Sequence, residues 1–66
     1  MMQQVICISK RKNSNQIEIG NIYYIDLMSV CGDSDGDWYG EVYADEFNEA
    51  DAYVGRMKLS HFKSAI

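Results

Sequence analysis

Short runs of apolar residues, separated by polar segments rich in Gly, Asn and Asp, set the pattern of this chain. The first run lies within residues 4–9, and the next two, 22–30 and 38–43, flank a polar segment at 31–37. Two aromatic-rich apolar runs around a cluster of Gly and Asp are typical of a β-hairpin with a polar tip. We therefore expect a first strand over 4–9, followed by a hairpin whose strands span 22–30 and 38–43.

Three other polar segments are expected as loops or turns. Residues 10–16 are seven consecutive polar residues, and Gly20 marks a tight turn where a positive φ is expected. Segment 45–51 admits two interpretations: Asp45 could cap a single helical turn, or Phe47 could anchor a hairpin loop. We favour the loop, because a single helical turn is marginally stable alone.

Three short elements are expected after this loop. They are a fourth strand over 52–58, a helical or 3-10 turn over 59–62, and a last strand over 64–66 beside the first strand. Five short strands with a turn before the closing strand are the plan of a small β-barrel. The predicted fold class is therefore all-β, with residues 1–66 forming one domain.

The alternation of side chains between the two faces of a strand predicts the core. It places Ile25 and Leu27 on the inner face of the second strand. In the third strand it puts Trp38, Gly40 and Val42 on one face. The other residues expected to reach the core are Ile17, Ile19, Ile22 and either Leu59 or Phe62.

The size of the chain restricts its function. Sixty-six residues, 47% of them hydrophobic, suffice for a compact core but not easily for a deep substrate cleft as well. No apolar run approaches the roughly 18 to 20 residues of a membrane span, and no charged leader precedes an apolar block. We expect a cytoplasmic, non-enzymatic protein without cofactor or membrane contact, which is a monomer or a weak homo-oligomer.

The two cysteines, Cys7 and Cys31, are too few and too far apart for a disulfide framework or a zinc site. Both adjoin apolar residues, so we expect buried free thiols that act as small hydrophobes. A single disulfide between them stays open as an alternative, although a cytoplasmic setting disfavours it.

Charge is divided unevenly along the chain. The net charge is −4, and all ten acidic residues lie between Asn13 and Gly55, a span without Lys or Arg. This balance argues against nucleic acid as the direct ligand, because phosphate binding requires a basic surface. The basic residues form two clusters near the ends: Lys10, Arg11 and Lys12, then Arg56, Lys58 and Lys63.

Three short sequence segments carry a resemblance to a known class of protein. They are Val-Ile-Cys-Ile at 5–8, Ile-Gly-Asn-Ile-Tyr at 19–23 and Leu-Ser-His-Phe-Lys at 59–63. Together with the order of elements, they resemble the small Src-homology-3-like barrel proteins of Gram-positive bacteria, their phages and prophages. The resemblance implies a five-stranded barrel with a short 3-10 turn before the last strand, and no catalytic residues. His61 stands where such proteins have an arginine.

The hairpin contains a pattern similar to a calcium-binding loop. Asp35, Asp37, Tyr39, Gly40 and Glu46 occupy positions 1, 3, 5, 6 and 12 of that template. Tyrosine does not supply the oxygen that position 5 requires, and an extended strand would carry the glutamate far from the first aspartate. No metal site is predicted, although a cation held by the aspartates of the hairpin tip stays open.

Catalysis has weak support in this sequence. His61 is the single histidine, and the spacing of Ser60 and Asp26 from it does not indicate a triad. A nucleophile elbow is also absent.

The aromatic residues are too numerous for so small a core, and strand alternation must place several of them outside. In Src-homology-3-like barrels, exposed aromatics beside acidic loops form a groove for proline-rich peptides. We therefore predict a protein-binding module with an unidentified protein partner. Its predicted docking residues are Tyr24, Asp33, Asp35, Asp37, Trp38, Tyr39, Glu41, Tyr43, Asp45 and Glu46.

Two variants of this prediction stay open. In the first, the docking carboxylates, with Glu49 and Asp51, imitate nucleic-acid phosphates and inhibit a DNA-binding protein. In the second, Trp38 and two tyrosines belong to the core and the remaining aromatics are ordinary surface residues.

The alternative function is a nucleic-acid-binding barrel. It requires the two basic clusters to converge into a phosphate-facing rim while the acidic middle of the chain faces away. The rim would consist of Lys10, Arg11, Lys12, Arg56, Lys58 and Lys63.

Overall fold

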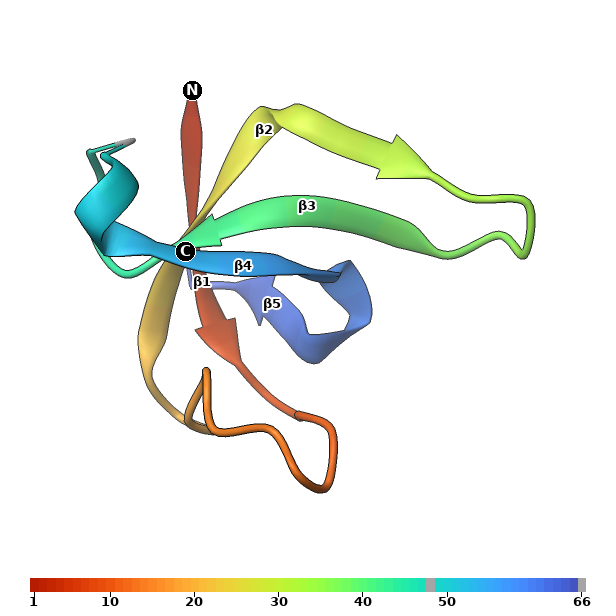
Figure 1. Cartoon of the computed structure of the whole chain (residues 1–66), viewed down its shortest axis with the longest axis horizontal. Coiled ribbons are helices and arrows are strands. Elements are labelled where there is room, and N and C mark those ends of the chain that lie inside the picture. The colour runs from red at the N-terminus through yellow and green to blue at the C-terminus, as the bar shows by residue number, and fades with distance from the viewer. Residues whose placement is uncertain (48, 66) are drawn as a thin grey trace.

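The structure, a computed structural model, describes residues 1–47 and 49–65 and is all-β (Figure 1). Its strands are β1 (Met2–Cys7), β2 (Ile22–Gly32), β3 (Trp38–Tyr43), β4 (Tyr53–Lys58) and β5 (Phe62–Ser64). Two 3-10 turns, η1 (Ala50–Ala52) and η2 (Leu59–His61), precede β4 and β5. The predicted all-β class, the five strands and the turn before the last strand are confirmed. The described residues contain no helix able to span a membrane.

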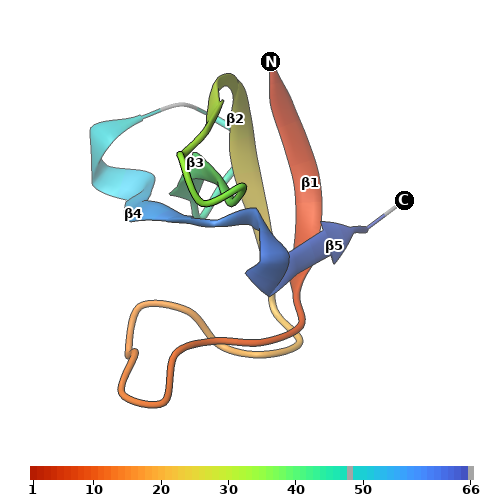
Figure 2. The same cartoon turned by 90° about the vertical axis from the view of Figure 1, so that its right-hand side faces the viewer.

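The five strands form one antiparallel sheet in the order β4-β3-β2-β1-β5. Strand β1 therefore runs between β2 and β5, which is visible in both Figure 1 and Figure 2. The predicted position of the last strand beside the first is confirmed, with Val5 opposite Ser64 and Cys7 opposite Phe62. Strands β4 and β5 are the two edges of the sheet, and no pairing closes it within the described parts of the chain.

Several strand boundaries differ from those predicted, and only 38–43 is confirmed without change. The first strand lies two residues earlier than predicted, since its pairing with β2 runs from Met2 opposite Asp26 to Ile6 opposite Ile22. The second strand extends to Gly32 rather than ending at residue 30, and β4 starts at Tyr53 because η1 occupies the preceding residues. The last strand starts at Phe62 rather than at residue 64, and the predicted end at Ile66 lies outside the described residues.

Segment 45–51 matches neither of its two interpretations fully. The carboxylate of Asp45 accepts a hydrogen bond from the N–H of Phe47 at 2.9 Å, but η1 is the only helical turn described in this region. Phe47 does not anchor the segment, since 61% of its surface is exposed. Asn48 lies outside the described residues.

The core lies on one face of the sheet and is closed by the loop that joins β1 to β2. Its buried members are Val5, Cys7, Ile17, Tyr23, Ile25, Val42, Met57 and Phe62. Tyr23 keeps its hydroxyl satisfied by accepting a hydrogen bond from the N–H of Glu18 at 2.8 Å. The predicted positive φ of Gly20 is confirmed at 93°, and the N–H of this residue donates to Cys7.

Three residues predicted for the core are exposed: Ile19, Ile22 and Leu27. Ile22 pairs with Ile6, and its side chain points to the outer face because the next residue, Tyr23, is buried on the inner face. Leu27 follows Asp26, where the pairing of β2 with β3 becomes irregular. Because the regular pleat stops there, alternation no longer directs Leu27 inward.

A bulge in β2 causes this irregularity. Asp26 pairs with Glu41 and Cys31 pairs with Tyr39, so β2 has more residues than β3 between these two points. Ser29 holds the bulge: its Oγ donates to the carbonyl of Asp26 at 2.6 Å and accepts from the N–H of Glu41 at 2.8 Å. Beyond the bulge, the hairpin extends well past the rest of the sheet (Figure 1).

Candidate functional site

Three tyrosines form a row across the face of the sheet that lies opposite the core. The register pairs Tyr24 of β2 with Tyr43 of β3, and Tyr43 with Tyr53 of β4. The rings of Tyr43 and Tyr53 are in contact, with their centroids 5.3 Å apart and their planes inclined by 59°. Tyr24 and Tyr43 are half-buried, whereas Tyr53 is exposed. We call these three residues the tyrosine row.

An ionic row crosses the same three strands beside the tyrosines, and it consists of Asp26, Glu41 and Arg56. The Nη1 of Arg56 donates to Oε1 of Glu41 at 3.1 Å, and its Nη2 donates to the Sγ of Cys31 at 2.6 Å. The carboxylate of Glu41 also acts on the hydroxyl of Tyr53, as the acceptor that raises its pKa. Glu41 therefore connects the ionic row to the tyrosine row.

The carboxylate of Glu41 changes the ionisation of both of its neighbours. Its hydrogen bond with Tyr53, together with partial burial and its negative charge, raises the pKa of that hydroxyl above the ordinary value of 10.0. Its hydrogen bond with Arg56 likewise raises the pKa of the guanidinium. At neutral pH the surface thus presents the neutral phenol of Tyr53 beside an ion pair.

Tyr53 was not among the predicted docking residues. Strict alternation along β4 would place it on the same face as the buried Met57. Val42 pairs with Gly55 and Tyr43 pairs with Tyr53, so β4 contains one additional residue at this point. The irregularity moves Tyr53 to the outer face. A glycine within a strand is a usual mark of such a bulge, so Gly55 was the available signal.

The structure brings together only some of the predicted docking residues. Tyr24, Glu41 and Tyr43 lie in the two rows, and Tyr39 lies further along β3 on the same face, opposite Lys58.

Trp38 lies on the other face of β3, next to Gly32 of β2. A Cβ at Gly32 would lie 3.5 Å from the indole ring, so the ring covers that backbone. The alternative assignment of Trp38 to the core is wrong, since 58% of its surface is exposed.

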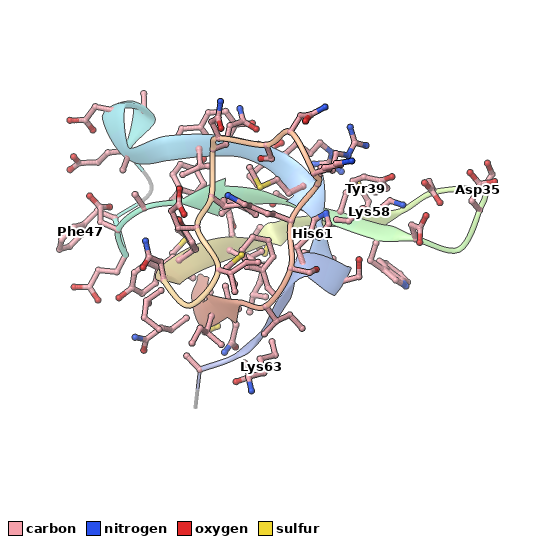
Figure 3. All side chains as sticks on the ribbon, turned by 90° about the horizontal axis from the view of Figure 1, so that it is seen from below. Asp35, Tyr39, Phe47, Lys58, His61 and Lys63 are labelled. Atoms are coloured by element: carbon pink, nitrogen blue, oxygen red, sulfur yellow. The ribbon has the colours of Figure 1, made fainter. Side chains whose placement is uncertain are left out.

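The predicted acidic residues are divided between two ends of the molecule. Asp35 lies at the tip of the β2–β3 hairpin, and Phe47 lies at the opposite end (Figure 3). Asp33 and Asp37 accompany Asp35 at the hairpin tip. Asp45 and Glu46 directly precede Phe47 in the chain. The predicted docking residues therefore do not form one acidic aromatic face.

The aspartates of the hairpin tip have structural roles in the turn. The Oδ1 of Asp33 accepts hydrogen bonds from the N–H groups of Asp35 and Asp37, at 2.9 Å and 3.0 Å. The carboxylate of Asp37 pairs with the Nζ of Lys58 at 3.2 Å. In residues 1–47 and 49–65, no three side chains of metal-binding type are grouped to hold an ion.

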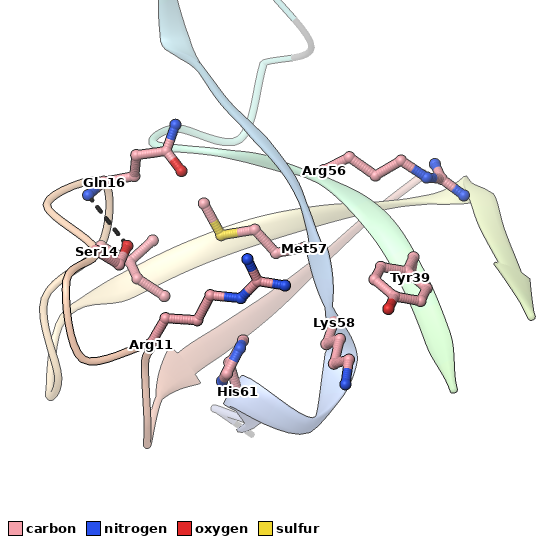
Figure 4. Close-up of a pocket in the computed structure, with 9 residues that line it drawn as sticks. Arg11, Ser14, Gln16, Tyr39, Arg56, Met57, Lys58 and His61 are labelled. Atoms are coloured by element: carbon pink, nitrogen blue, oxygen red, sulfur yellow. Dashed lines mark hydrogen bonds between the residues drawn. The ribbon is translucent and has the colours of Figure 1, made fainter. Parts of the chain in front are cut away.

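A pocket of about 150 Å³ lies between the 8–21 loop, β4 and η2 (Figure 4). Its lining includes Arg11, Ile17, Tyr39, Met57, Lys58 and His61, and we call it the basic pocket. The cations come from the two predicted basic clusters, so these clusters do converge at this point. Sequence reasoning did not identify the pocket itself, because its apolar wall comes from two distant segments, Ile17 in the loop and Met57 in β4.

The six predicted basic residues do not form a continuous rim. Lys10 pairs with Glu18 at 3.8 Å, Arg56 pairs with Glu41, and Lys58 pairs with Asp37. Lys63 lies on β5, well away from Lys58 (Figure 3). Lys12 lies in the exposed 8–21 loop and does not line the basic pocket.

The remaining candidate groups have simple environments. Both cysteines are free; Cys7 is buried as predicted, whereas the predicted burial of Cys31 is wrong, because the bulge and hairpin leave it exposed. The Nδ1 of His61 lies 3.0 Å from the hydroxyl of Ser9, so this residue, rather than Ser60 or Asp26, is its polar contact.

A comparison of the chain with protein-family models, with curated proteins and with solved structures finds no significant match.

Proposed function

We propose that this chain is a small non-enzymatic protein-binding module that docks through the tyrosine row and the adjoining Glu41. The observation that carries the proposal is the row itself: three tyrosines on three adjacent strands, none of them in the core. Tyrosine gives a large, rigid contact surface with a polar tip, and it is enriched at protein interfaces.

The electrostatic setting of the row indicates the chemistry of the partner. Glu41, which is paired with Arg56, and Asp26, whose Oδ1 accepts from the N–H of Met28, place carboxylates beside the rings. The raised pKa of Tyr53 keeps its hydroxyl in the neutral form. A complementary surface would combine apolar or proline-rich segments with Arg or Lys side chains, which favour both aromatic faces and carboxylates.

The Src-homology-3-like assignment is part of the same proposal. It is supported by the pairing of the first strand with the last and by the 3-10 turn that precedes the last strand. In such barrels a surface of aromatic residues binds extended peptides. A phage or prophage origin and a cytoplasmic location are proposed with it. The version in which carboxylates imitate phosphates has less support, because the acidic residues lie at opposite ends of the molecule (Figure 3).

The proposal is tested by comparing capture by wild-type chain with capture by a variant that lacks two members of the row. Immobilised wild-type chain and the Tyr24→Ser, Tyr53→Ser double variant are exposed to the same bacterial lysate, half of it treated with nuclease, and eluted in salt steps. Ile19→Ser is the matched control, since it removes an exposed apolar side chain from the 8–21 loop, outside the row.

We expect a protein that wild-type and Ile19→Ser capture equally and that the double variant fails to retain. Equal retention by the double variant, with a thermal melt showing that it is folded, would overturn the proposal. Material that disappears after nuclease treatment would also contradict it.

A nucleic-acid-binding role is the second candidate function. The convergence of Arg11 with Arg56 and Lys58 at the basic pocket favours it, whereas the ion pairs of Arg56 and Lys58 weaken it. A gel-shift titration with plain DNA and RNA tests it, and an absence of retardation at low salt would eliminate it.

A further inference from the structure

We infer that the basic pocket is a binding site for a phosphate monoester group. This site is separate from the tyrosine row and does not depend on the proposed protein-binding function. It is built from three segments: the 8–21 loop supplies Arg11, the end of β4 supplies Lys58, and η2 supplies His61. These side chains surround one space beside Met57 (Figure 4).

Part of the wall of the pocket is apolar, because Ile17 and Met57 line it beside the polar and charged side chains. Ile17 and Met57 are both core residues, with only 2% and 9% of their surfaces exposed. An anion bound against this wall would be partly removed from water. Its attraction to nearby cations would therefore be stronger than at an open surface.

Arg11 is the principal reason to expect an anion. Its guanidinium makes no ion pair with any residue that the structure describes, although two other cationic side chains line the same pocket. The hydrogen bond and negative charge of Asp37 raise the pKa of Lys58. The positive charge of Arg11 acts on the same pKa in the opposite direction and is the smaller effect. Like charges held close together around an open space are stabilised when an anion occupies it.

The donors available in the pocket match the geometry of a phosphate. The planar guanidinium of Arg11 can donate two parallel hydrogen bonds to a pair of phosphate oxygens, which a lysine cannot do. His61 uses Nδ1 in its contact with Ser9, so Nε2 is its ring atom for a ligand. Ser14, which also lines the pocket, adds a hydroxyl.

The surroundings favour a single phosphate group over a nucleic-acid backbone. A pocket of about 150 Å³ accommodates one such group, and Asp37 and Glu41 pair with the cations at its rim. With a net charge of −4, the chain repels an extended polyanion, whereas one dianionic group has to approach only Arg11 and its neighbours. The group could belong to a small metabolite or to a phosphorylated side chain of a protein.

The inference is tested by NMR titration of the isotope-labelled chain at constant ionic strength. The probes are inorganic phosphate, free phosphoserine, a phosphoserine peptide, its unphosphorylated form and a short oligonucleotide. We expect saturable shifts at Arg11, Ser14, Lys58 and His61 with the three phosphate monoester or phosphate probes, and none with the unphosphorylated peptide.

Variants of two basic residues distinguish phosphate binding in the basic pocket from attraction of phosphate to any positive charge on the surface. Arg11→Gln should weaken phosphate binding about tenfold or more, as expected for the loss of a bidentate charged contact. Lys12→Gln removes the same charge from the adjacent position outside the pocket and should leave the affinity nearly unchanged.

Three results would overturn the inference: no saturable shifts, equal weakening by both variants, or equal shifts with chloride in place of phosphate. Binding of the oligonucleotide more tightly than phosphoserine would also overturn it and would favour the nucleic-acid function. If the inference holds, a phosphopeptide that binds more tightly than free phosphoserine identifies a protein source, and equal affinities identify a small molecule.

Discussion

The carboxylate of Glu41 acts as a hydrogen-bond acceptor toward the hydroxyl of Tyr53 on the adjacent strand and thereby raises the pKa of that hydroxyl. The contact favours the neutral phenol, so the pKa of Tyr53 lies above 10.0 in the folded chain. In an ultraviolet absorbance titration, we expect one tyrosine to ionise late and Glu41→Gln to return it toward the ordinary range. The Tyr53→Phe variant should remove this late component. An identical titration curve for wild type and Glu41→Gln would contradict the assignment.

The same contact determines a pH dependence of stability. Because the pKa of Tyr53 is raised on folding, the associated stabilisation is complete below the unfolded value of about 10 and is lost as the pH rises through the folded value. Lys58 acts in the same direction, since its pKa is raised above 10.5 by Asp37. We therefore expect the unfolding midpoint in urea to fall above pH 10, and to fall less in the Tyr53→Phe variant.

Gly40 lies where three apolar side chains approach the backbone of β3. A Cβ at this position would lie 3.0 Å from Cγ2 of Ile25 and 3.3 Å from Leu59 and Val30. These atoms must shift to admit it, so Gly40→Ala should lower the free energy of unfolding by about 1–3 kcal/mol. The matched control is Gly32→Ala, whose Cβ would make an ordinary 3.5 Å contact with Trp38. Equal urea midpoints for both variants would refute this account of the packing.

The two cysteines differ sharply in accessibility, which a thiol reagent can measure. Cys7 is 1% exposed and its Sγ contacts the carbonyl of Ser9, whereas Cys31 is exposed beside Arg56. We expect one thiol per chain to react readily in native buffer and the second only after unfolding. Cys31→Ser should abolish the native reaction, while Cys7→Ser should leave it intact. Rapid reaction of both thiols in the native wild type would show that the core is more open than described.

Asp33 organises the hairpin tip through its side chain. Its Oδ1 accepts two backbone hydrogen bonds, as in the side-chain turns typical of Asp and Asn. Asp33→Ala should therefore cost about 1 kcal/mol of unfolding free energy, by analogy with the loss of a capping side chain. Asp33→Asn keeps an acceptor oxygen and should cost less, which chemical denaturation can resolve. If both variants lose the same stability, charge rather than hydrogen bonding is responsible.

The sequence predicted the number and order of the strands because alternating apolar runs and Gly- or Asp-rich turns are local signals. It also predicted the burial of Ile25, which lies in a regularly paired stretch. It misplaced Leu27 because the bulge after Asp26 ends that regularity. Where a strand pairs irregularly, the face to which each side chain points depends on the pairing with the neighbouring strand. The periodicity of the sequence does not contain that information.

The candidate sites were less predictable than the fold, because they depend on contacts between distant segments. Tyr53 joins the tyrosine row through a bulge at Gly55, and Arg11 joins Lys58 through the path of a long loop. Charge clusters in the sequence located the relevant cations. An ion pair neutralises some of these cations, as Asp37 does for Lys58. The sequence does not show which ones, because ion pairing depends on side-chain distances in the folded chain.

The pairing of β1 with β5 has a consequence for how this chain reaches its native state. Phe62 belongs to the core and lies opposite Cys7, almost the full length of the chain away. A growing chain therefore cannot complete its core until Phe62 has been synthesised, and contacts of such long range slow folding. Until that moment, the apolar run at Val5 remains an unpaired strand edge, which is the type of surface that nucleates aggregation and attracts chaperones.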